Sequence, residues 1–500
     1  MQLGWIQITM SVLYLLLIVG VGLYMSRRVK SSDDYWVGGR EVGPFTTALS
    51  YCAAYVSTVA IIGNPPMYYR YGLGFAGFGT ASVCLFVACV IFIVLAPKMR
   101  ALSERLDAVS FPGFMAVRYS SNKLRLVCAL LIAVMMIPYS ISAVKGIADA
   151  LNVVAGVPYA AAVVVLTLVA IFYLVTSGYW GVATTDLIQG LVISISLLAV
   201  AVSVLFATGG LSPIIEYMKT DYPQHLTASS GMSWPALFSY AGVWSFIAFG
   251  QPQLIAKFMG LKDARTMGVV IRTGIVWMAV FMISITILGI GALYLFQGRK
   301  FENIDMIAPS VVAGYTGPYI SGLFLCGILA AGLSTIVALV LTASSAVAKD
   351  IFEDYRSAGK KSGSADSVRI GRIFTGVILV VTALGALYPP DFVWSLSTMA
   401  GGVMGAAFTA PLILGLYWQR ATPQGAYVAV VSGAVVSIAW YLAGLTYIVH
   451  SFVPGIVVSF VLMYAVSLMT KPMPKDHVDV FFEAGCSQDK IDAAIASGKA

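Results

Sequence analysis

Residues 329–335 read Leu-Ala-Ala-Gly-Leu-Ser-Thr, and they lie near the middle of an apolar segment between about 318 and 347. A segment of this length can cross a membrane as a single helix. The adjacent hydroxyls of Ser334 and Thr335 need partners at that depth. They can bond to a carbonyl one turn earlier in the same helix, or they can bind a hard cation, because such ions prefer oxygen ligands. The stretch alone leaves both interpretations open.

The composition defines the class of protein. The chain has 500 residues, of which 59% are hydrophobic and 10% charged. Long continuous apolar runs predict an all-α integral membrane protein, since the strands of a barrel alternate apolar and polar residues. The six cysteines form no Cys-x-x-Cys pair and the three histidines are scattered. We therefore expect neither disulfides, nor a redox site, nor a metal cluster built from these residues.

Hydropathy predicts about thirteen membrane spans. Their approximate limits are 5–25, 45–68, 74–97, 126–150, 159–177, 185–208, 234–258, 268–296, 318–347, 370–388, 392–417, 425–447 and 453–470. Apart from Lys145, the middles of these spans are nearly free of ionisable groups. An enzyme or a respiratory subunit would need buried relays of such groups, so we do not expect an enzyme.

The positive charges orient the predicted spans. Roughly 24 of the 30 lysines and arginines fall in segments on one side of the membrane. Because cytoplasmic loops carry the excess of Lys and Arg, the N-terminus is predicted outside and the C-terminus in the cytoplasm. The chain is thus expected to be a multi-pass protein of the cell (inner or plasma) membrane. The net charge of +8 comes from cations that gather on one side of the membrane, so it does not indicate binding to nucleic acid.

Two predicted spans are interrupted. Span 2 contains small and polar residues at 50–58 and Gly-Asn-Pro-Pro at 63–66, and span 7 contains Gly242 and then Gly-Gln-Pro at 250–252. The two spans are five apart, an odd number, so repeats that begin with them would cross the membrane in opposite directions. Broken helices at matching places in inverted repeats indicate a transporter binding site at the midplane.

These repeats set the predicted organisation of the chain. It comprises an N-terminal span and loop (1–44), a first repeat (45–208), an inverted second repeat (209–417), two further spans (418–470) and a cytoplasmic tail (471–500).

The breaks also offer candidate ligands. Ala53 and Val56 are three residues apart, so their carbonyls can face one point if span 2 unwinds there. Ala331 and Ser334 have the same spacing, and Thr335 is next to them. Five such oxygens would suit Na⁺, although the spacing alone does not distinguish Na⁺ from a bound water.

Several motifs resemble the sodium:solute symporter family over about residues 5–470. They are residues 328–335 with the exit at 344–350, Asp-Asp-Tyr-Trp-Val-Gly-Gly-Arg at 33–40, Thr-Asp-Leu-Ile-Gln-Gly at 185–190 and Gly-Gln-Pro-Gln at 250–253. The resemblance implies a LeuT-type fold with an inverted five-helix repeat. It also implies Na⁺-driven solute uptake by alternating access.

The resemblance further implies site residues. The family's usual sodium site falls on Ala53, Val56 and Ala331 through carbonyls, and on Ser334 and Thr335 through hydroxyls. Some members have a second sodium site with extra hydroxyls just after this pair, where this chain has Val337 and Ala338. That departure favours one Na⁺ per solute. Asp186 resembles an aspartate on the inward sodium path, although it can also be an interfacial carboxylate in water.

Five residues are candidates for the substrate site. Tyr139, Ser140 and Trp244 align with the pocket of the proline-transporting branch, and Ser57 and Gln251 lie at the two breaks. Each of the aromatic rings can instead serve only helix packing.

Other residues bear on the branch of the family. The proline branch has an aspartate where this chain has Tyr55, and residues 54–57 and 68–74 look closer to the pantothenate and monocarboxylate branches. We expect a small solute that bears a carboxylate, with pantothenate or a monocarboxylate preferred over proline. Proton coupling on the same fold is the other alternative.

The carboxylate of that solute needs a partner. Lys145 is expected to snorkel to the interface, which leaves the N–H groups of a half-helix to receive the anion. The expected partners of the chain are thus this solute, Na⁺ and the lipid bilayer, and no obligate protein partner is indicated.

Overall fold

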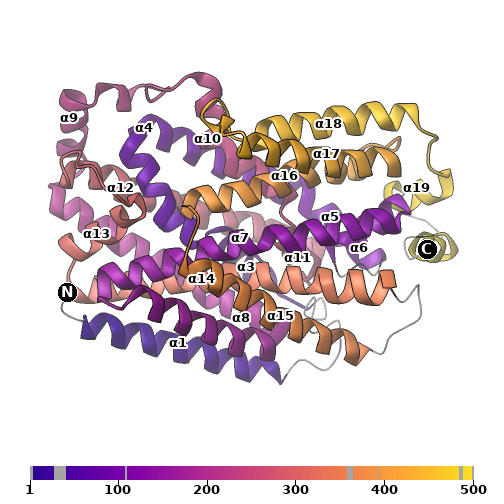
Figure 1. Ribbon diagram of the computed structural model, residues 1–500, viewed down its shortest axis with the longest axis horizontal. Coiled ribbons are helices and arrows are strands. Elements are labelled where there is room, and N and C mark those ends of the chain that lie inside the picture. The colour runs from indigo at the N-terminus through magenta and orange to yellow at the C-terminus, as the bar shows by residue number, and fades with distance from the viewer. Residues whose placement is uncertain are drawn as a thin grey trace.

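The protein is described by a computed structural model, which covers residues 4–27, 41–106, 108, 110–356, 364–391, 393–483 and 488–497. The motif predicted at 33–40 lies outside these residues. The long helices run along the long axis of the molecule (Figure 1). They are α1 (Trp5–Ser26), α7 (Asn122–Ala155), α8 (Tyr159–Thr208), α12 (Met267–Leu295), α14 (Pro318–Ser345), α15 (Ser364–Leu387), α16 (Val393–Tyr417), α17 (Pro423–Leu442) and α18 (Phe452–Met469).

Short helices lie at the two ends of this bundle. At one end are α9 (Leu211–Asp221) and α13 (Ile307–Tyr315), and at the other are α6 (Phe111–Tyr119) and α19 (Lys475–Phe482) (Figure 1). We call these the α9/α13 end and the α6/α19 end. The remaining short elements are two helices, one π-helical segment and several 3₁₀ turns. The helices are α5 (Ala96–Arg105) and α20 (Gln488–Ser497), and the π-helical segment is η8 (Ala346–Arg356). The turns include η4 (Pro223–Leu226), η6 (Ala264–Thr266), η7 (Ile304–Met306) and η9 (Leu445–Tyr447).

In the described residues, ten helices are long and apolar enough to cross a membrane. The all-helical membrane fold is therefore confirmed, but the count of thirteen is not. One apolar run covers 59–105 continuously, where parts of two spans were predicted. Its kink is at Gly72, which has a positive φ of 78°, and Gly178 in α8 has a positive φ of 53° close to the predicted boundary of spans 5 and 6.

Helix α14 forms the centre of the bundle. It packs against α8, α7 and α1, and 94% of its most apolar window is buried, compared with 22% for α1 and 28% for α18. Apolar side chains on the outer helices remain exposed, among them Leu13 of α1 and Val461 of α18. An apolar periphery around a buried central helix suits a protein whose outer surface faces lipid.

The break predicted in span 2 is present. Helix α3 (Pro44–Tyr55) ends there, and Val56 is extended at φ −85° and ψ 90°. The chain then resumes as the π-turn η2 (Val59–Gly63), α4 (Asn64–Ser82) and the π-helical segment η3 (Val83–Leu95). The two prolines at 65 and 66 lie in the first turn of α4, where their missing N–H groups are not needed, so they do not form a second break.

The break predicted in span 7 is also present. Helix α10 (Trp234–Ile247) passes through the 3₁₀ turn η5 (Ala248–Gly250) to an extended Gln251, and α11 (Pro252–Met259) follows. Gly242, the other predicted breakpoint, is an ordinary residue of α10. Its lack of effect is expected physically, because a lone glycine weakens a helix without interrupting it.

The prediction for Lys145 was wrong. Its side chain is buried, and its Nζ lies 2.6 Å from Asp149 Oδ2 and 2.6 Å from Asp305 Oδ2. Asp305 Oδ2 also accepts the backbone N–H of Val393, at the start of α16, at 3.1 Å. Two carboxylates hold the ammonium inside the protein, which removes the reason for it to reach the interface.

Candidate functional site

The break in span 2 packs against the middle of α14. Ser334 Oγ donates to the carbonyl of Ala53 at 2.9 Å and to that of Ala331, in its own helix, at 3.0 Å. Thr335 Oγ1 donates to the carbonyl of Ala54 at 3.5 Å. The two hydroxyls therefore join the central helix to the end of α3, and Ser334 also makes the local bond to its own helix.

The five predicted sodium ligands are all buried in this region. Ala53, Ala331 and Ser334 meet directly, whereas Thr335 bonds to the residue after Ala53. Val56 lies just beyond the end of α3, so its carbonyl is outside the helix. The C-terminal end of a helix carries partial negative charge, which favours a cation next to it. The donor set of carbonyls and hydroxyls suits Na⁺.

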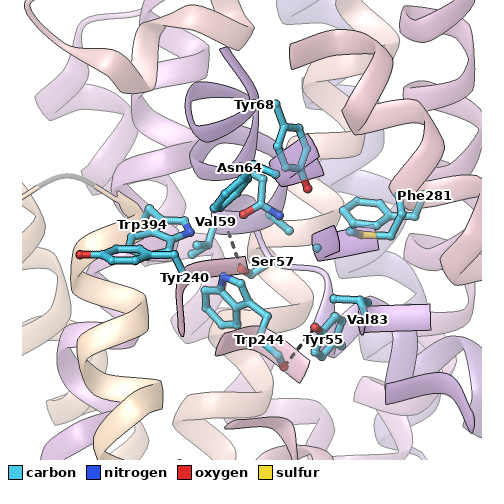
Figure 2. Close-up of a pocket in the computed structure, with 14 residues that line it drawn as sticks. Tyr55, Ser57, Val59, Asn64, Tyr68, Val83, Tyr240, Trp244, Phe281 and Trp394 are labelled. Carbon is cyan, nitrogen blue, oxygen red and sulfur yellow. Dashed lines mark hydrogen bonds between the residues drawn. The ribbon is translucent and has the colours of Figure 1, made fainter. Parts of the chain in front are cut away.

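A small cavity lies beside the break, with a free volume of about 30 Å³. A single water needs about 10–15 Å³ by this measure, so the cavity has room for two or three waters. Aromatic side chains and a few polar groups from both broken helices surround it (Figure 2). Its lining includes Tyr55, Ser57, Val59, Asn64, Tyr68, Phe75, Tyr240, Trp244, Phe281, Met282 and Trp394.

Two of the five predicted substrate residues, Ser57 and Trp244, line this cavity. Tyr139 does not line it but lies next to Trp244, with the two ring centroids 6.4 Å apart. Ser140 bonds instead to the carbonyl of Met136 in its own helix, and Gln251 is buried against Gln253. The structure does not bring these last two to the cavity, and their role stays a prediction.

Other lining residues were not predicted from the sequence. Asn64 and Tyr68 come from α4, Phe281 comes from α12 and Trp394 begins α16. Asn64 carried a signal, because it is the polar residue of the Gly-Asn-Pro-Pro stretch. Nothing in the sequence distinguished Trp394 or Phe281 from packing residues. The indole N–H of Trp244 is buried without a partner among the described residues, so it is free to donate to a solute.

A wide cleft opens toward the α9/α13 end, with a free volume of about 750 Å³. Tyr240 and Trp394 line both this cleft and the small cavity. Their rings are stacked at 5.5 Å with an angle of 14° between the planes, and Figure 2 shows them together at one side of the cavity. This aromatic pair therefore separates the cavity from the cleft. Three cations, Arg70, Arg299 and Lys300, also line the cleft.

Asp186 lies deeper than an interfacial carboxylate. Its side chain is fully buried, and its Oδ2 accepts hydrogen bonds from Ser50 Oγ at 2.6 Å and Lys257 Nζ at 2.7 Å. The alternative of an interfacial carboxylate in water is therefore wrong. Asp186 and Lys257 lie at the ends of predicted spans 6 and 7, and both side chains are buried there.

Comparison with known sequences supports the family. The model of the sodium:solute symporter family matches residues 35–433. The osmoregulated proline transporter OpuE of Bacillus subtilis (strain 168) is 30% identical over 481 residues, which is 94% of this chain and 96% of the relative. The sodium/proline symporter of Staphylococcus aureus (strain JH9) is 29% identical, over 94% of this chain and 93% of the relative.

Solved structures share the fold. The substrate-bound outward-open state of a Na⁺-coupled sialic acid symporter aligns with a TM-score of 0.81 at 20% identity, over 93% of this chain and 98% of that one. MhsT in complex with L-phenylalanine aligns with a TM-score of 0.53 at 14% identity, over 86% and 98% of the two chains. These are membrane transporters of the LeuT-type fold. The chain belongs to the sodium:solute symporter family, and its matches are transporters rather than enzymes.

Proposed function

We propose that this protein uses the Na⁺ gradient to import a small solute that bears a carboxylate, and that proline or a similar small amino acid is the first candidate. The observation that carries the proposal is the contact between Ser334 and the carbonyl of Ala53 at the break of span 2. At this contact, oxygens suited to Na⁺ lie close to the small cavity, because Ser57, one residue beyond the break, lines that cavity.

The relatives favour an amino acid over pantothenate. Two relatives that match nearly the full length are named as proline transporters. These relatives do not support the preference for pantothenate or a monocarboxylate over proline that was expected from Tyr55 and its neighbours.

A small monocarboxylate is the second candidate, because of the charge of the open cleft. Arg70, Arg299 and Lys300 line it, and a cleft lined by one sign of charge concentrates ions of the other sign. A solute with a net negative charge would gain more from this than a zwitterion.

In the proposed mechanism, Na⁺ and solute bind cooperatively. Na⁺ between α3 and α14 orders the chain at Val56 and Ser57, and so completes the lining of the cavity. Coupling between two such sites is typically worth about 1–3 kcal/mol. The membrane potential adds about 2.3 kcal/mol per charge for each 100 mV. The positive-inside rule puts the α9/α13 end outside the cell and both the α6/α19 end and the C-terminus in the cytoplasm.

Uptake into proteoliposomes tests the proposed substrate. Labelled proline, acetate, pyruvate and pantothenate would be supplied in parallel, with either Na⁺ or K⁺ outside. We expect Na⁺-dependent uptake of proline, with excess unlabelled proline abolishing it. Na⁺-dependent uptake of acetate or pyruvate alone would establish the second candidate. The absence of Na⁺-dependent uptake or binding of all four would overturn the assigned class of substrate.

A further inference from the structure

One buried carboxylate connects parts of both broken helices. Asp186 of α8 accepts a hydrogen bond from Ser50, in the half-helix α3 that precedes the first break. The same oxygen contacts the ammonium of Lys257, in the half-helix α11 that follows the second break. The exposed fraction of each charged side chain is 3% or less. These half-helices are therefore joined through one carboxylate on a third helix.

Other polar groups near this carboxylate are unsatisfied. The second oxygen of Asp186, Oδ1, is buried without a hydrogen-bond partner among the described residues. The same holds for the hydroxyl of Thr47, one turn before Ser50 on α3, and for the amide of Gln189, one turn after Asp186 on α8. Residues three apart lie on the same face of a helix, so these groups follow the two faces that Ser50 and Asp186 join.

Buried polar groups without partners are uncommon and costly. Here the oxygens of one carboxylate, two hydroxyls and one amide follow two packed helix faces. Oxygens of these kinds are what an alkali or alkaline-earth cation binds. A single positive charge is already present, and it belongs to Lys257.

We propose that this cluster is a second cation position, and that the Lys257 ammonium fills it in place of a mobile Na⁺. The inference rests on the proposed Na⁺ symport. Ser50 is one helical turn before Ala53, a rise of about 4.5 Å along α3, so the position adjoins the first Na⁺ site. A tethered ammonium neutralises Asp186 but cannot be carried across the membrane. The protein then moves one Na⁺ for each solute.

The surroundings give Lys257 a place to move. Lys257 lines a second small cavity, of about 40 Å³, together with Tyr179, Gln253 and Ser345. Its Nζ lies 5.5 Å from the centre of the Tyr179 ring, a distance at which the face of the ring attracts a cation. When the ammonium leaves Asp186 for this cavity, α3 and α11 lose their common anchor, so the half-helices can separate as the α6/α19 end opens.

The test is to remove the tethered charge and count Na⁺. A Lys257→Gln variant keeps a polar side chain but leaves Asp186 without its counter-ion. We expect equilibrium binding of radioactive Na⁺ to the purified variant to rise from about one to about two ions per chain, with the Hill coefficient for Na⁺ rising toward two. The matched control is Asp186→Asn/Lys257→Gln, in which no charge needs balancing and the count returns to about one.

A second measurement applies if Lys257→Gln folds poorly. We expect Na⁺, compared with K⁺, to raise the unfolding temperature of Lys257→Gln more than that of the wild type or the double variant. An unchanged Na⁺ count together with no extra stabilisation by Na⁺ would overturn the proposal.

The test is independent of the proposed function as a whole. If wild-type protein shows no Na⁺-driven uptake, the proposed function fails, but a gain of one bound Na⁺ in Lys257→Gln over the double variant still supports the second position. If uptake is Na⁺-driven and the variant gains no ion, only the second position fails.

Discussion

At the scale of single residues, the hydroxyl of Ser334 connects two parts of the structure. It bonds to Ala331 in its own helix and to Ala53 at the end of α3. The local bond and the contact across the break therefore coexist. A cation that entered between these oxygens would replace bonds that already hold the two helices together.

Loss of these hydroxyls should weaken Na⁺ binding. We expect Ser334→Ala, Thr335→Ala and the double variant to raise the Na⁺ concentration for half-maximal uptake at least tenfold. Tenfold corresponds to about 1.4 kcal/mol, close to the lower limit of about 1.5 kcal/mol for one hydrogen bond to a charged group. The measurement is uptake against Na⁺ concentration. Thr342→Ala, two turns further along α14 with only a local bond to Ala338, is the control. Unchanged Na⁺ dependence in the double variant would remove these residues from the site.

The free indole N–H of Trp244 should contribute to solute binding. Trp244→Phe keeps an aromatic ring in the cavity and loses the donor, so we expect the KM for the solute to rise about tenfold, as for a lost bond to a carboxylate. Trp418→Phe is the matched control, since that ring stacks on Tyr464 and does not line the cavity. Equal KM values for the two variants would show that Trp244 only packs.

Lys145 should matter for stability. Lys145→Met leaves Asp149 and Asp305 buried without their counter-ion, and breaking such a buried ion pair typically costs about 3–5 kcal/mol. We expect a clear fall in the unfolding temperature in detergent. Lys219→Met is the control, because Lys219 and its partner Glu216 are both largely exposed and such pairs contribute little. If the two variants unfold at the same temperature, the ion pairs of Lys145 with Asp149 and Asp305 do not stabilise the fold.

At the scale of elements, the break in span 7 depends on close packing of backbones. A Cβ atom at Gly250 would lie 2.8 Å from Gly405 Cα in α16, whereas at Gly242 the nearest atom would be 3.6 Å away in a side chain. Two glycines thus let the break touch α16. The extended Val56 in span 2, and the 3₁₀ turn with the extended Gln251 in span 7, are the observed forms of breaks that the sequence indicated only as polar and glycine-rich stretches.

Gly250 and Gly242 give a matched test. We expect Gly250→Ala to cost about 1–3 kcal/mol, as overpacking does, and to reduce transport, because the backbone of α16 must shift. Gly242→Ala should be neutral or slightly stabilising, since alanine favours a helix. The measurements are the unfolding temperature and the initial rate of uptake. Normal stability and transport in Gly250→Ala would show that the contact tolerates a methyl group.

At the scale of the whole molecule, the sequence predicted what depends on local patterns. Hydropathy located most of the long helices. Small and polar residues marked the break in span 2, and glycine and proline marked the break in span 7. The buried ion pairs could not be predicted, because the partners are far apart in the chain: Lys145 and Asp305 are 160 residues apart, and Asp186 and Lys257 are 71 apart. Only the packing of α7 against η7, and of α8 against α11, brings such residues together. For the same reason Trp394 could not be recognised as a cavity residue.

The folded bundle also shows a difference between its ends. A wide cleft opens at the α9/α13 end, whereas the cavity near Lys257 is small. The stacked rings of Tyr240 and Trp394 lie between the cleft and the central cavity. This arrangement suits one step of alternating access, in which solute enters from the cleft.

Accumulation of the solute against its own gradient is the most direct test of Na⁺-driven transport. Proteoliposomes would contain the same concentration of labelled solute inside and outside, and an inward Na⁺ gradient would then be imposed. We predict that the internal concentration rises above the external one, and that it falls back when an ionophore collapses the Na⁺ gradient. Equal concentrations throughout, despite Na⁺-dependent solute binding, would contradict the account.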